Sequence, residues 1–186
     1  MKPLDKYIKE YKEIQDSSNK LKEVKAKQQK IIEVLTPAIP IKIEGCDYFK
    51  VNTLKALHLI KNKLPEEYNA VLNYINKIKQ GNNSQWFENN LINKIFSFGE
   101  LTYSSLIECY ASSIVHDSYH SKLYHDYCKT YGTTNVPYNV YGGENGEYAC
   151  LEYQISFLEK INAEKSLIDQ AKSSRMTHWW ETDINW

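Results

Sequence analysis

Hydrophobic side chains recur at helical spacing over most of the chain, so the sequence predicts a mainly helical protein. Residues 4–35 carry apolar side chains at alternating spacings of three and four, which predicts one long helix with an interrupted heptad stripe. Pro37 and Pro40 end that helix. We therefore expect an N-terminal helical arm at residues 1–37 and a second domain at residues 38–186.

The first half of the second domain combines short β-branched segments with amphipathic helices. Residues 39–43 are typical of a strand, and residues 52–80 predict two consecutive helices, the second beginning at Pro65. Residues 85–104 fit either a helix or a strand with a turn at Gly99.

The second half predicts three helices and one loop. The helices are expected at about residues 105–129, 147–162 and 163–180, with a glycine-rich loop at 131–145. The pattern therefore predicts an α+β fold that is mainly helical, with a small sheet and the N-terminal helical arm.

Composition places the chain among globular proteins and separates the arm from the rest by charge. Its 186 residues are 42% hydrophobic and 25% charged, with a net charge of zero, which argues against a general nucleic-acid binder. Residues 1–36 hold nine lysines against six acidic residues, so the remainder is net negative. The arm is either a solvated helix docked along one stripe or a coiled coil for association with itself or a partner.

No targeting or membrane segment is apparent in the sequence. The N-terminus lacks the apolar core of a secretory signal, and no apolar run approaches the roughly 18 residues of a transmembrane helix. The four cysteines form no CxxC pair and fit reduced core thiols, with two disulfides as the alternative if the chain is exported without a cleaved signal. We therefore expect a cytoplasmic protein that does not insert into membranes.

The segment that suggests chemistry is His116-Asp117-Ser118-Tyr119-His120 within the helix predicted at 105–129. Histidines four residues apart on a helix lie on one face, about 5–6 Å apart at Cβ, where they can share one metal ion. A carboxylate directly after the first histidine lies beside the metal-bound water, as a general base does. Apolar and small residues precede the motif, so we expect this helix to be buried.

A zinc site of this type needs a third protein ligand from elsewhere in the chain. Glu147 is our candidate, because it opens the next predicted helix, whose Ala149 and Cys150 we expect to point inward. Glu144 and Glu152 are the alternatives. Glu152 lies roughly 140° from Glu147 around the helix, so the two are not expected to point inward together.

With these residues the chain resembles the HExxH zinc metallopeptidases that have a downstream glutamate ligand, the gluzincin-type zincins. The resemblance implies a minimal zincin-like domain in which His116, His120 and Glu147 bind zinc, Asp117 is the general base, and a peptide or protein is the substrate. The chain departs from the family at Asp117, where the family has glutamate. A side chain one methylene shorter must then reach the water within about 2.6–3.2 Å.

Two other functions stay open from the sequence. A zincin-like scaffold without the catalytic glutamate can be a binding or structural protein that keeps or has lost its metal. The His116-Asp117 pair also resembles the central motif of HD-type phosphohydrolases, which would add His58 and Asp169 as ligands and make Asp117 a ligand itself.

Aromatic residues surround the candidate site, and one further histidine accompanies tryptophans near the C-terminus. His178 precedes Trp179 and Trp180, where it can stabilise a developing oxyanion; alternatively, the tryptophans seal the core or an interface. Many of the 15 tyrosines cluster near the histidine pair and the glycine-rich loop, whereas His125 lies on a different helix face from His120.

Overall fold

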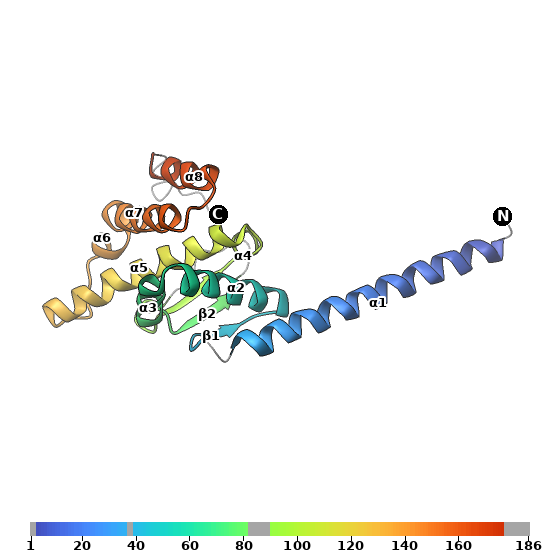
Figure 1. Ribbon diagram of the computed structural model, residues 1–186. Coiled ribbons are helices and arrows are strands. Elements are labelled where there is room, and N and C mark those ends of the chain that lie inside the picture. Colours follow the sequence, from blue (N-terminus) through green and yellow to red (C-terminus); the bar gives the residue numbers. More distant parts are fainter. Residues whose placement is uncertain (1–2, 37–38, 82–89, 177–186) are drawn as a thin grey trace.

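The computed structural model describes residues 3–36, 39–81 and 90–176, with side chains described from residue 16 to residue 175. Figure 1 shows the helices and strands in these ranges. They are α1 (Pro3–Leu35), β1 (Lys42–Glu44), α2 (Asp47–Lys63), α3 (Pro65–Tyr74), β2 (Lys77–Gln80), β3 (Ile95–Phe98), α4 (Glu100–Tyr103), α5 (Ile107–Tyr131), α6 (Tyr138–Tyr141), α7 (Gly143–Lys160) and α8 (Lys165–Met176). The fold is α+β and mainly helical, as the sequence predicts.

The three strands form one small parallel sheet in the order β1-β2-β3. Ile43 pairs with Ile78, which in turn pairs with Phe96. Side chains alternate across the sheet, and Ile78, Phe96 and Phe98 are buried on its covered face. The helices α2 and α3 connect β1 to β2, as a crossover between parallel strands requires.

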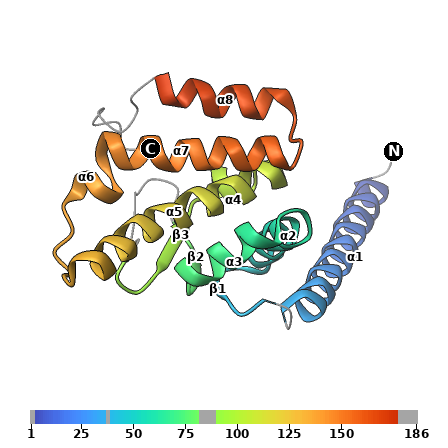
Figure 2. The same ribbon diagram turned by 60° about the vertical axis from the view of Figure 1, so that its left-hand side comes forward.

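The helix α5 is at the centre of the molecule, where it packs against α2 and α3 on one side and α7 on the other. Figure 2 shows α5, α7 and α8 stacked in succession above the sheet. The side chains of Tyr110, Ile114 and Val115 on α5 are fully buried in the core. The predicted burial of the histidine-bearing helix is therefore correct.

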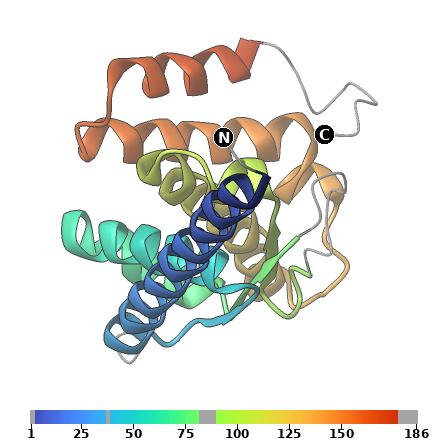
Figure 3. The same cartoon turned by 90° about the vertical axis from the view of Figure 1, so that its right-hand side faces the viewer.

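The helix α1 extends away from the rest of the molecule, as Figure 1 shows, and in Figure 3 the same blue helix points toward the viewer in front of the other elements. Its side chains at residues 16–27 are all exposed, and Ile32 and Leu35 pack against the core. The described part of the arm therefore docks only through its last turns. Its pairing with a second helix stays a prediction.

The structure corrects the predicted end of the second helix. That helix begins at Pro65 as expected but ends at Tyr74, and residues 77–80 are strand β2 rather than helix. Ile75 is already extended, with φ −128° and ψ 117°. The spacing of Ile75 and Ile78 fits a helical face, but both are β-branched and pack equally well on a sheet.

Two uncertain regions take definite structures. Residues 95–98 form strand β3 and Gly99 precedes the short helix α4, so the strand-and-turn alternative is correct there. The predicted loop 131–145 contains the short helix α6. Within the described ranges, no helix combines the length and the apolar character needed to cross a bilayer.

Candidate metal centre

His116 and His120 project from one face of α5 toward α7. Their Nε2 atoms are 3.0 Å apart, and their rings meet edge to face with centroids 4.8 Å apart. The side chains are 12% and 14% exposed, so water has limited access to them. The spacing of four residues thus produces the convergence that it predicts.

Glu147 enters the same space from α7. One carboxylate oxygen, Oε2, lies 3.5 Å from Nε2 of His116, and the other, Oε1, lies 3.5 Å from Nε2 of His120. Glu147 is only 2% exposed. Burial alone would raise the pKa of this carboxyl, but its polar contacts with His116 and His120 outweigh burial and lower the pKa to about 2. The carboxylate is therefore ionised.

Cys150 completes the cluster, and the sequence reasoning missed it as a candidate ligand. It is fully buried, and its sulfur lies within 4.8 Å of ring nitrogens of both His116 and His120. Burial raises the pKa of the thiol, which the neighbouring His120 partly offsets. Its separation of three residues from Glu147 on one helix is the signal that could have identified it.

The His120 ring has a defined orientation. Its Nδ1 atom lies 2.5 Å from the backbone carbonyl oxygen of Tyr141. A carbonyl oxygen can only accept, so Nδ1 carries the hydrogen and Nε2 faces His116 and Glu147. Burial lowers the pKa of His120, but Cys150 and Glu147 raise it well above its ordinary value. Without a cation, His120 is therefore the positive partner of Glu147.

The donor set could hold a metal ion. Two nitrogens bound at about 2.0–2.1 Å to one tetrahedral ion lie roughly 3.3 Å apart, close to the 3.0 Å separation of the two Nε2 atoms. The same separation suits an N–H···N hydrogen bond in the metal-free protein. Nδ1 of His116 and Oε2 of Glu147 are buried without a hydrogen-bond partner among the described residues. A cation would give Oε2 a partner.

Asp117 lies next to the cluster but outside it. Burial raises the pKa of its carboxyl to about 6, against the attraction of His116 and His120, while the nearby Glu147 raises it further. Asp117 is therefore close enough to be affected by all three charges. The side chains whose ligand atoms all lie within 4.8 Å of one another are His116, His120 and Cys150, so Asp117 and Glu147 are both outside this set, although Glu147 contacts both histidines.

The other predicted candidates lie elsewhere. Glu144 is exposed, and Glu152 is exposed and forms an ion pair with Arg175, so neither takes the place of Glu147. His178 lies outside the described residues. In the described ranges, His58 and Asp169 join no group of three or more possible metal ligands, so the extra ligands of the HD-type alternative do not converge there.

Several tyrosines of α5, α6 and α7 pack against one another. Tyr119 stacks on Tyr153 with ring centroids 4.5 Å apart, and Tyr141 meets Tyr124 and Tyr138 edge to face. His125 lies apart from the cluster, as expected, with its Nε2 atom 2.9 Å from the carbonyl oxygen of Leu91. All four cysteines are free thiols, but Cys46 is exposed rather than a core residue.

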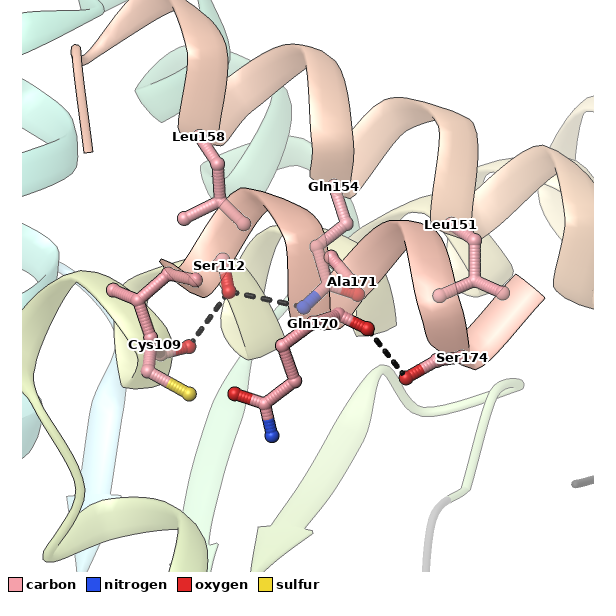
Figure 4. A pocket seen from close by; sticks show the side chains of 9 residues that line it. Cys109, Ser112, Leu151, Gln154, Leu158, Gln170, Ala171 and Ser174 are labelled. Carbon is pink, nitrogen blue, oxygen red and sulfur yellow. Dashed lines mark hydrogen bonds between the residues drawn. The ribbon is translucent and has the colours of Figure 1, made fainter. Parts of the chain in front are cut away.

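A small cavity of about 110 Å³ lies between α5, α7 and α8 (Figure 4). At its α5–α7 side, Gln154 donates a hydrogen bond of 3.0 Å to Ser112, which is one helical turn before His116. The walls mix apolar and polar side chains: Cys109, Ser112, Leu151, Gln154, Leu158, Leu167, Gln170, Ala171 and Ser174. None of the candidate ligands His116, His120, Glu147 and Cys150 lines this cavity, so it is separate from the candidate metal centre.

Comparisons with known proteins give no relative from which a function could be inferred. No protein-family model, curated protein or solved structure matches the chain. The chemistry of the cluster must therefore be argued from its own geometry.

Proposed function

We propose that the protein is a zinc-dependent hydrolase that cleaves peptide bonds. In this proposal His116, His120 and Glu147 hold the ion, and Asp117 is the general base. One observation carries it: the two Nε2 atoms are 3.0 Å apart, and each is 3.5 Å from the buried Glu147 carboxylate. Two imidazoles and a carboxylate form a recurrent ligand set of catalytic zinc.

The donors favour zinc over the harder cations. Magnesium and calcium prefer shells made of oxygen atoms, whereas this cluster offers imidazole nitrogens with a thiol beside them. The ionised Glu147 supplies the negative charge that a buried divalent cation needs.

In the proposed reaction, the protein supplies a proton acceptor and a buried site whose side chains are held in fixed positions. When bound, zinc polarises the substrate carbonyl and lowers the pKa of a coordinated water toward about 7. The Asp117 carboxylate would accept the proton of the attacking water and pass it to the nitrogen of the leaving amine. The peptide substrate follows from the resemblance to zincins.

The decisive experiment measures metal content and hydrolysis in two variants. Purified wild-type protein should hold about one zinc per chain, and His116→Ala should lose it. Asp117→Asn should keep zinc while hydrolysis of a fluorescent casein falls by about 10²–10⁴-fold. Asn145→Ala, an exposed change on α7, is the matched control and should alter neither quantity.

Other results would overturn the proposal. A wild-type protein that binds much less than one zinc per chain, with no change in His116→Ala, contradicts the metal centre. Loss of zinc in Asp117→Asn would make Asp117 a ligand, as in the HD-type alternative, and hydrolysis of p-nitrophenyl phosphate would then be the activity to test.

A structural zinc site is the second candidate, because Cys150 lies within reach of both histidines. Four protein ligands would close the site and leave no position for water. Replacing zinc with cobalt distinguishes a structural site from a catalytic one. A thiolate-to-cobalt charge-transfer band that disappears in Cys150→Ala would indicate a structural site with four protein ligands. If the site is catalytic and keeps an open coordination position, no such band is expected, and Cys150→Ala should still bind zinc.

A further inference from the structure

The orientation of His120 depends on a backbone atom of another element. Its Nδ1–H donates to the carbonyl oxygen of Tyr141, the last residue of α6. Metal-binding histidines are commonly fixed in this way, through the ring nitrogen that does not bind the metal. The position of α6 therefore decides where Nε2 of His120 points.

The place of Tyr141 depends in turn on a close approach between α6 and the first turn of α7. The backbone N–H of Gly146 donates to the carbonyl oxygen of Gly142 at 3.2 Å. A Cβ atom at Gly146 would lie 2.5 Å from the carbonyl carbon of Tyr141 and 2.9 Å from its oxygen. Because these are backbone atoms, they cannot change rotamer to make room for a Cβ atom at Gly146.

Helix propensity does not explain a glycine at this position. Gly146 lies inside α7, where alanine would favour the helix by up to about 1 kcal/mol. Contact with the Tyr141 backbone is the structural reason for glycine here.

We propose that Gly146 is a positioning residue of the metal centre: its missing side chain lets the Tyr141 carbonyl reach His120 and aim Nε2 at the ion. This inference rests on the proposed zinc site. It also explains part of the glycine-rich segment 142–146, which the metal ligands alone leave unexplained.

The test compares Gly146→Ala with Asn145→Ala, an exposed neighbour in the same helix that gains the same helix-favouring residue. Zinc affinity is measured by competition with a chromophoric chelator, and the His120 Nδ1–H proton is followed by NMR in the metal-free protein. Gly146→Ala should bind zinc at least tenfold more weakly and lose the protected Nδ1–H signal. Asn145→Ala should match the wild type in both.

The outcomes separate this inference from the proposed function. Tight zinc binding and an unchanged Nδ1–H signal in Gly146→Ala would overturn the inference and leave the zinc site standing. A wild type that binds no zinc would overturn the proposed site, although loss of the Nδ1–H signal in the variant would still show that Gly146 positions His120.

A second variant covers the case in which Gly146→Ala does not fold. Tyr138 is 63% exposed, and its ring packs edge to face on Tyr141 beside Gly142. Tyr138→Ala should loosen α6 without unfolding the protein, weaken zinc binding by a smaller factor and speed exchange of the Nδ1–H. No change in either quantity would contradict the inference.

Discussion

The pKa of Asp117 is set by burial more than by its charged neighbours. Burial raises it to about 6 from its usual value near 3.8, although His116 and His120 oppose the shift. A carboxyl whose pKa is higher in the folded than in the unfolded protein destabilises the fold once it ionises. Such a cost is common where a residue is kept for function rather than stability.

Asp117→Asn should therefore stabilise the metal-free protein in a pH-dependent way. The gain should be roughly 2–3 kcal/mol above pH 6, where the folded wild type carries the charge, and should vanish below about pH 3.8. Urea unfolding at pH 8 and pH 3.5 measures both values. An equal gain at the two pH values would mean that packing, not ionisation, is responsible.

For individual residues, spacing in the sequence predicted the site best where the residues share one helix. His116 and His120 meet because they are four residues apart on α5, and Glu147 meets them from the first turns of α7. Their role as metal ligands stays a prediction. Cys150 was overlooked because a buried cysteine is most simply a packing residue, and only the position of α7 against α5 brings its sulfur to the histidines.

Among the elements, helices were easier to predict than the small sheet. The start of α3 followed from Pro65, whose fixed φ suits a first helical turn. Strand β2 could not be separated from a helix by periodicity, because the run is short and its partners β1 and β3 are distant in sequence. Whether such a segment forms a strand or a helix depends on its pairing with distant strands, which the spacing of its own side chains does not indicate.

The helix α1 should be dispensable for the stability of the rest of the molecule up to its last turns. A chain that lacks residues 1–27 should unfold within about 0.5 kcal/mol of the full chain, because side chains 16–27 are exposed. Leu35→Ala, which removes a contact with the core, should cost about 1–2 kcal/mol. Urea denaturation measures both.

The same truncation tests the coiled-coil hypothesis for the arm. If two arms pair, light scattering should give twice the chain mass for the full protein and the single mass for the truncated one. Equal masses for both would contradict pairing of the arms. A loss of more than about 2 kcal/mol on truncation would show that the arm stabilises the fold directly.

For the whole molecule, metal binding should add to the free energy of unfolding, since the cluster joins α5 to α7. Zinc at about one hundred times its dissociation constant should add about 2.7 kcal/mol, and His116→Ala should abolish the gain. Urea unfolding with and without zinc measures this. An equal gain in His116→Ala would place the bound zinc elsewhere.

The candidate centre takes its residues from two helices that follow one another in the chain, α5 and α7, with only α6 between them. Its first and last members, His116 and Cys150, are therefore close in sequence, and closing the loop between them has a modest entropy cost. Chains whose contacts join elements that follow one another fold faster than chains whose contacts join distant elements. During synthesis on the ribosome, the nascent chain can thus assemble this centre once α7 has emerged, before α8 is complete.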